Sequence, residues 1–272
     1  MIKKRFKPRS LLHTSFLIMS LSLSACGPAA APISESPRML RVYAAASLTE
    51  AFTEIGRAFE ASHPGVTLMF NFGGSQNLRT QIEQGASADV FASANSMELD
   101  ALVAAKLIDA DAPKVFLTNQ LTVILPAGFS TRINSLQDLS RPGLKIILAA
   151  EEVPAGKYAR QVLYNLNNTF GADYQEKVLA NVVSNEDNIR QVVAKVQLGE
   201  ADAGIVYISD AISAPELQTI SIPADANVTA EYQIAPPIDA VNPDLAKEFI
   251  AYILSPEGQK ILKKWGFTPV AQ

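Results

Sequence analysis

Small and hydroxyl-bearing residues stand where apolar runs give way to helical patterns. Residues 43–50 read Tyr-Ala-Ala-Ala-Ser-Leu-Thr-Glu, so Ser47 and Glu50 have the spacing of a capping box. Residues 71–78 place Ser75 after two glycines and before a helical pattern, and glycines let an atom come near backbone N–H groups. Each hydroxyl could cap its own helix or bind a ligand, and these two alternatives stay open.

Three further junctions share this character. Residues 151–159 place Pro154 in a first helical turn, and residues 184–190 place polar capping residues before a helix. Residues 203–207 form an apolar run that ends in a tyrosine, whose hydroxyl either donates to a ligand or reaches water. Free N–H groups and the positive end of the helix dipole make a helix start a site for an anion. Several such starts could therefore hold a dianion without lysine or arginine.

The junctions belong to a repeating alternation of strands and helices. Apolar residues at three-four spacing predict a helix from Leu48 through Phe59 and another from Ile189 through Val196. This alternation predicts an α/β fold with mostly parallel sheets, in which ligands bind beyond the carboxyl ends of the strands. The predicted strands are 40–43, 66–72, 89–92, 121–125, 144–148 and 203–208.

The amino-terminal segment has the order of a secretory signal. Five basic residues and no acid fall within residues 1–10, an apolar run covers 11–23, and Leu-Ser-Ala-Cys ends it at Cys26. This run is shorter than the roughly 20 residues that span a bilayer. The pattern resembles the lipobox of bacterial lipoproteins, so we expect a lipoprotein signal peptide over 1–25, lipid on Cys26, and a flexible tether over 26–38. The alternative is a chance cysteine in an ordinary signal.

Composition excludes several functions. Beyond residue 26 the chain has 18 basic and 27 acidic residues, a net charge of −9, which argues against nucleic acid as a partner. His63 is the single histidine there, in a predicted turn, and Cys26 is the single cysteine of the whole chain. Histidine-based catalysis and histidine or cysteine metal sites are therefore not expected. A carboxylate mechanism stays open from composition alone, but no acid pair marks a predicted ligand junction.

Six segments in one order resemble the periplasmic molybdate-binding proteins of ABC transporters over about residues 39–270. The resemblance implies a type II periplasmic-binding-protein fold, with two α/β lobes joined by two crossover strands and the ligand in the cleft. It implies one lobe of residues 39–121 with 229–272 and another of 122–228. The segments are 44–52 (AAASLTEAF), 72–78 (FGGS-x-NL), 88–94 (ADVFASA), 153–159 (VPAGKYA), 199–207 (GEADAGIVY) and 255–267 (SPEGQKILKKWGF).

The resemblance also implies the site and the task. Hydroxyls and backbone N–H groups would bind molybdate or tungstate as an intact oxyanion, with no direct bond from protein to metal and no cofactor. The protein would deliver the ligand to a membrane permease served by an ATPase, work as a monomer, and stay in the cell envelope through its lipid anchor. The implied ligand-binding residues are Ser47, Ser75, Ala155, Ile189 and Tyr207.

Two departures and three rival interpretations accompany this expectation. Glu151 and Glu152 replace an Asn- or Asp-Pro pair common in the family, and Gln76 replaces a serine found in some relatives. The same fold could bind sulfate, phosphate or a small organic anion, although the five implied residues include no carboxylate to accept a proton of phosphate. An enzyme on this fold and a purely structural surface lipoprotein are the other interpretations.

Overall fold

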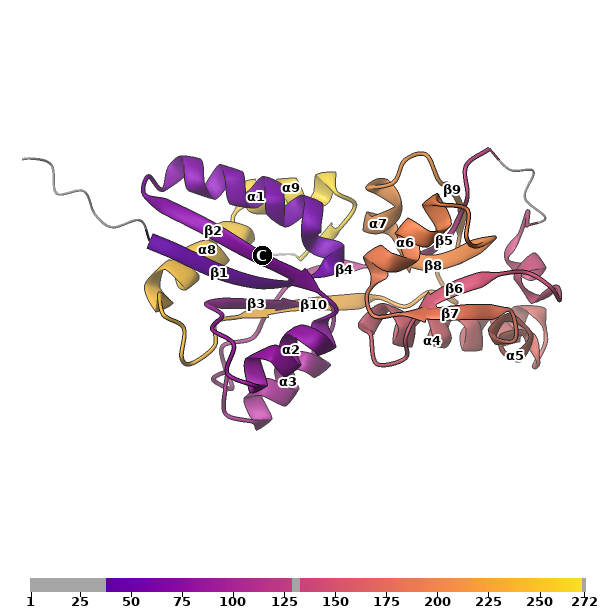
Figure 1. Cartoon of the computed structure of the whole chain (residues 1–272), viewed down its shortest axis with the longest axis horizontal. Helices are drawn as coiled ribbons and strands as arrows, with labels where there is room; N and C mark the ends of the chain where they lie inside the picture. Colours follow the sequence, from indigo (N-terminus) through magenta and orange to yellow (C-terminus); the bar gives the residue numbers. More distant parts are fainter. Residues whose placement is uncertain (1–37, 129–132, 271–272) are drawn as a thin grey trace, which may run out of the picture. The chain divides into compact units, whose positions relative to one another are not determined.

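The computed structural model describes residues 38–128 and 133–270 (Figure 1). The predicted signal peptide, Cys26 and nearly all of the tether lie outside the described residues. Arg38, assigned to the tether, instead begins the first strand and pairs with Val66. No helix in the described part of the chain is both long enough and apolar enough to span a membrane.

The first sheet has six strands in the order β11-β4-β10-β3-β1-β2. Helices cover both of its faces, with α1 and α9 on one side and α2 and α3 on the other (Figure 1). Its strands are β1 (Arg38–Ala45), β2 (Val66–Gly73), β3 (Val90–Ser93), β4 (Lys114–Asn119), β10 (Ala230–Ala235) and β11 (Thr268–Pro269). Its helices are α1 (Thr49–Ser62), α2 (Ser75–Glu83), α3 (Met97–Ala104), α8 (Pro243–Leu254) and α9 (Pro256–Lys264).

The second sheet has five strands in the order β7-β6-β8-β5-β9. Its strands are β5 (Leu121–Leu125), β6 (Ile146–Ala149), β7 (Val182–Glu186), β8 (Ala203–Tyr207) and β9 (Gln218–Ser221). Its helices are α4 (Pro154–Phe170), α5 (Tyr174–Leu179), α6 (Ile189–Gln197) and α7 (Ile208–Ile212). Two short 3₁₀ helices, Ala46–Leu48 and Leu136–Ser140, complete the described elements.

Both sheets are mixed, so the prediction of mostly parallel sheets was wrong. Strands β1, β2 and β3 are parallel to one another, as are β6, β7 and β8, but β10 and β11 in the first sheet and β5 and β9 in the second pair antiparallel to their neighbours. The reason is that the chain crosses between the sheets at residue 120 and again at residues 222–229. The strands beside these crossings, β5 and β10, enter in the opposite direction.

The two α/β sheets agree with the two-lobed periplasmic-binding-protein fold that the resemblance implies. We call the part with the six-stranded sheet the first lobe and the part with the five-stranded sheet the second lobe, and we keep the predicted lobe boundaries as a proposal. The proposed boundary after residue 121 differs from the structure by one residue, because Leu121 pairs with Tyr207 in the second sheet.

The amphipathic patterns became the buried faces of two helices. In α1 the buried residues include Phe52, Ile55 and Phe59, and the Phe59 ring packs edge-on against Phe249 of α8 at 5.2 Å between centroids. In α6 the buried residues are Ile189, Val192, Val193 and Val196, the four that were predicted. Burial of these faces fixes the helices on their sheets, and thereby places the first turn of each helix.

Candidate functional site

One cavity lies where both lobes contribute helix starts. All five residues implied by the sequence line it: Ser47 and Ser75 from the first lobe, and Ala155, Ile189 and Tyr207 from the second. Residues 108 positions apart, Ser47 and Ala155, therefore face a common space. The structure brings the predicted set together, and its ligand-binding role stays a prediction.

Ser47 does not cap a helix, so the capping-box prediction was wrong. It lies in the 3₁₀ turn before α1, and no side-chain cap is formed at the start of either helix. Its hydroxyl instead lies 2.9 Å from that of Tyr232 on β10, and both side chains are buried. Glu50, the expected partner in the box, points to Arg190 of the second lobe. The hydroxyl of Ser47 is thus positioned by the crossover strand rather than by its own helix.

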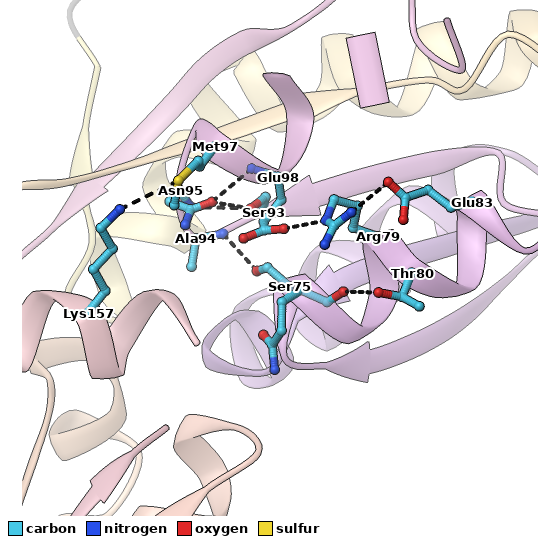
Figure 2. A network of polar contacts seen from close by, with 11 residues as sticks. Ser75, Arg79, Thr80, Glu83, Ser93, Ala94, Asn95, Met97, Glu98 and Lys157 are labelled. Carbon is cyan, nitrogen blue, oxygen red and sulfur yellow. Dashed lines mark hydrogen bonds and ion pairs between the residues drawn. The ribbon is translucent and has the colours of Figure 1, made fainter. Parts of the chain in front are cut away.

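Ser75 is the first residue of α2, not the residue before the helix as predicted. Its Oγ accepts a hydrogen bond from the backbone N–H of Ala94 at 3.1 Å (Figure 2). An acceptor role toward Ala94 leaves the Ser75 hydroxyl hydrogen available as a donor. One turn further along α2, Arg79 pairs with the buried Glu98 at 2.7 Å, which ties α2 to α3 (Figure 2).

Ala155 and Ile189 contribute backbone groups from the first turns of α4 and α6. Pro154 occupies the first turn of α4, as predicted, and the Asn188 side chain caps α6 by accepting from Arg190 and Gln191. Within the described residues, the backbone N–H groups of Ala155 and Ile189 donate to no protein acceptor. Both are among the first N–H groups of a helix, which lack an intrahelical partner. They are free to donate to an anion.

The Tyr207 hydroxyl is a buried donor without a protein partner. Its residue is 1% exposed, and no hydrogen bond to the hydroxyl oxygen is formed by the described residues. Burial raises the pKa of Tyr207 well above its usual value, and burial likewise raises the pKa of Tyr232. Both hydroxyls therefore keep their protons at neutral pH. An unpaired buried hydroxyl costs stability unless a ligand accepts from it.

The cavity wall carries no charge. Its lining, in the described part of the chain, is glycine, alanine, valine, proline, isoleucine, serine, asparagine and tyrosine. The space leaves about 10 Å³ for the centre of a water-sized sphere, room for about one water. The described residues also contain no group of three histidine, cysteine or acidic side chains that could hold a metal ion.

Tyr232 was not among the predicted site residues, although the sequence around it contains a signal for a buried position. Apolar residues at positions 230, 232 and 234 alternate with polar ones, which is typical of a strand with one buried face. Residues 230, 232 and 234 are fully buried in β10. That alternation would have placed the Tyr232 side chain inward, next to the first helix start.

A buried carboxyl group behind Tyr207 was also missed. Asp210 is 1% exposed, accepts from the backbone N–H of Tyr207 at 3.2 Å, and leaves its second oxygen unpaired. Burial raises its pKa to about 7, against the opposing effect of the Arg190 charge. Asp210 does not line the cavity, so a ligand would feel its charge without touching it.

Backbone groups of the two lobes approach closely beside the cavity. A methyl group built on Gly74 would lie 2.5 Å from the carbonyl oxygen of Asp187 in the second lobe. Gln76 donates to that same carbonyl oxygen at 3.1 Å. The absence of a side chain at Gly74 therefore allows the lobes to meet.

Comparison with known proteins agrees with this geometry. A family model described as bacterial extracellular solute-binding protein matches residues 40–268, nearly all of the described chain. The chain belongs to this family. Individual solute-binding proteins are similar to it over nearly their full length. The molybdate-binding protein ModA of Mycobacterium tuberculosis is 39% identical over 251 residues, which cover 90% of this chain and 92% of that protein.

Two further similarities are to a lipoprotein and to a sulfate-binding protein. The putative ABC transporter substrate-binding lipoprotein YvgL of Bacillus subtilis is 30% identical over 264 residues, covering 97% of this chain and 99% of that protein. The structure of the sulfate-binding protein SubI of Mycobacterium tuberculosis superposes with a TM-score of 0.76 at 20% identity, covering 86% of this chain and 87% of that one. At that identity the similarity concerns the fold alone.

The two departures from the family pattern have different locations in this solute-binding protein. Glu151 and Glu152 are exposed and do not line the cavity. Gln76 is buried and spans the gap between the lobes through its bond to Asp187. The extra acids are therefore placed to change the field outside the cavity, whereas Gln76 is placed to affect how the lobes meet.

Proposed function

We propose that this solute-binding protein captures molybdate or tungstate between its lobes and delivers it to the permease and ATPase of an ABC importer. The observation that carries the proposal is the uncharged cavity lined by Ser47, Ser75, Ala155, Ile189 and Tyr207. Hydroxyls and N–H groups from both lobes would surround a single anion. The similarity to the molybdate-binding protein of Mycobacterium tuberculosis supports the choice of ligand.

The donors suit an oxyanion that carries no proton. Hydrogen bonds to a charged group contribute about 1.5 to 3 kcal/mol each, so a few of them hold a dianion without a cationic side chain. Phosphate at neutral pH still carries a proton and needs an acceptor for it. No carboxylate lines the cavity among the described residues, and the Asn188 oxygen already accepts two backbone N–H groups. This chemistry disfavours phosphate.

Sulfate is the second candidate, because it is also a tetrahedral dianion without a proton at neutral pH. The fold is shared with a sulfate-binding protein, and neutral donors do not by themselves separate the two ions. Discrimination would rest on cavity size, since donors at fixed distances fit the larger tetrahedron of molybdate better. Sulfate therefore enters the test as a competitor.

A thermal-shift panel of molybdate, tungstate, sulfate and phosphate tests the ligand. A ligand at 100 times its dissociation constant adds about 2.7 kcal/mol to the unfolding free energy. For a chain of this size that raises the melting temperature by about 5 to 10 °C. We expect the shift at low micromolar molybdate or tungstate. Shifts with sulfate alone would assign the protein to sulfate, and product formed from a bound substrate would assign it to catalysis.

We further propose that lipid on Cys26 anchors the protein to the cell envelope. The Leu-Ser-Ala-Cys sequence supports this, together with the similarity to a lipoprotein of Bacillus subtilis. Labelling cells with a fatty-acid analogue should mark the wild-type protein and leave Cys26→Ser unmarked. Equal label in both would reject Cys26 as the attachment site.

Light scattering of the purified protein should give the mass of a monomer.

A further inference from the structure

An ion pair joins the two lobes at the edge of the cavity. Arg190 of α6 donates to Glu50 of α1 through both terminal nitrogens, Nη2 to Oε1 at 2.6 Å and Nη1 to Oε2 at 3.2 Å. The Ser213 hydroxyl, just after α7 in the second lobe, lies 3.3 Å from the same carboxylate, but its single hydrogen also faces the nearer carbonyl oxygen of Ser209 at 3.0 Å. The other ion pairs between described residues each lie within one lobe.

The pair is attached directly to two segments of the site. Glu50 follows Ser47 by three residues, and Arg190 follows Ile189 immediately. The two charged side chains are 24% and 35% exposed, so they are partly shielded from water. A contact here pulls the start of α1 and the start of α6 toward each other. Those segments bear one hydroxyl and one N–H group of the cavity.

The position of Arg190 is unfavourable for its own helix. A cation in the first turn of α6 opposes the positive end of the helix dipole. Glu50 offsets this cost, but only while the lobes are together, because its carboxylate belongs to the other lobe. Other contacts across this gap use uncharged acceptor atoms. Gln76 donates to the Asp187 carbonyl oxygen at 3.1 Å, and Lys157 Nζ lies 3.5 Å from the Met97 sulfur.

We propose that Glu50 and Arg190 form a latch that holds the lobes closed over the ligand and sets how tightly the ligand is retained. The inference rests on the proposed capture of an oxyanion between the lobes. The latch residues do not line the cavity. They would act by stabilising the closed state in which the donors of Ser47 and Ile189 converge, and so act as positioning residues.

The direction in which one substitution changes molybdate affinity distinguishes a latch from a purely electrostatic effect. Glu50 is a negative charge near a site for a dianion, so if it acted only through its field, Glu50→Gln would tighten molybdate binding. If Glu50 is half of a latch, the same substitution loosens binding. Glu54→Gln is the matched control. Glu54 lies one turn along the same helix, and its substitution removes an ion pair of similar length, Lys264 Nζ to Oε2 at 2.7 Å. Its partners Lys264 and Trp265, however, belong to the first lobe.

The test is calorimetric titration of molybdate into the full purified protein and its variants. We expect Glu50→Gln and Arg190→Gln each to raise the dissociation constant about threefold to tenfold, the range of a partly shielded ion pair. The double variant should raise the dissociation constant by less than the product of the two single-variant factors, because both substitutions remove the same interaction. Glu54→Gln should bind as the wild type does. Unchanged or tighter binding by Glu50→Gln overturns the latch.

Small-angle X-ray scattering of the ligand-free variants tests lobe closure independently of ligand binding. Without ligand, Glu50→Gln should give a larger radius of gyration than Glu54→Gln, since fewer molecules are closed. Equal radii overturn the latch. If the wild type gives no heat with molybdate, the proposed function fails, and the scattering comparison alone then decides on the latch.

Discussion

The hydroxyl groups of Ser47 and Tyr232 lie 2.9 Å apart, although 185 positions separate the two residues. Ser47 belongs to the turn that opens α1, and Tyr232 to the crossover strand β10. Tyr232 also packs edge-on against Tyr207 at 5.7 Å between ring centroids. The crossover strand therefore positions one hydroxyl of the cavity directly and contacts the ring that carries another.

Ser47→Ala should weaken molybdate binding at least tenfold. Loss of one charge-assisted hydrogen bond costs about 1.5 kcal/mol or more, and 1.4 kcal/mol corresponds to a factor of ten. Tyr232→Phe should have a smaller effect, because it frees the Ser47 hydroxyl to rotate but leaves the donor in place. Titration calorimetry measures both. A greater loss from Tyr232→Phe than from Ser47→Ala would contradict these roles.

Gly74→Ala should abolish tight binding without unfolding the protein. Gly74 has φ −63° and ψ 132°, which alanine adopts without strain. Within the first lobe a methyl group would meet the Gln76 side-chain amide at 2.6 Å, and that flexible side chain must turn away. The methyl group would, however, meet the Asp187 carbonyl oxygen of the second lobe at 2.5 Å and block closure. We expect a melting temperature within a few degrees of the wild type without ligand, and little or no shift with molybdate. A full ligand-induced shift would show that closure does not need this close approach.

Asp210→Asn should stabilise the protein increasingly as pH rises from about 4 to 7. Burial raises the pKa of Asp210 to about 7, whereas an unfolded aspartate titrates near 3.9. Between these values the folded state holds a proton that the unfolded state has released, so the stability of the wild type falls as pH rises. Each unit of difference is worth about 1.4 kcal/mol, and the total is of the order of a few kcal/mol.

Thermal unfolding of Asp210→Asn and wild type at several pH values checks this. The difference in melting temperature should grow from pH 4 to pH 7 and then level off, because both states are ionised above pH 7. Ligand-free protein is used at every pH, so that binding does not enter. A difference that stays constant with pH would mean that Asp210 is ionised in the folded protein.

The local features of the fold were predictable, and the long-range ones were not. The apolar stripes of α1 and α6 followed from residues such as Phe52 and Val192, because burial of one helix face imposes a three-four spacing that is visible in sequence. Two crossover strands were expected and 121–125 was predicted as a strand, but the antiparallel direction of β5 and β10 was not predicted, because strand direction depends on which sheet the chain enters next. Short runs such as residues 182–186 were missed because they alternate weakly and lie at a sheet edge.

The candidate site shows the same division. The positions of Ser75, Ala155 and Ile189 at helix starts followed from glycine, proline and capping residues nearby. The partner of each group did not, since Ser47 was expected to bond within its own turn and instead faces Tyr232. Glu50 likewise pairs with Arg190, 140 positions away, rather than with the start of α1. Such pairs arise only when the lobes pack, and a local motif cannot specify them.

The most direct test of oxyanion capture is calorimetric titration of molybdate into the purified wild type and into Ser75→Ala. Ser75 lines the cavity, and its hydroxyl hydrogen is available because its oxygen accepts from Ala94. We predict saturable binding of one molybdate per chain by the wild type, and a dissociation constant at least ten times higher for Ser75→Ala. Absence of saturable molybdate binding by the wild type, or equal affinity in the two proteins, would contradict the account.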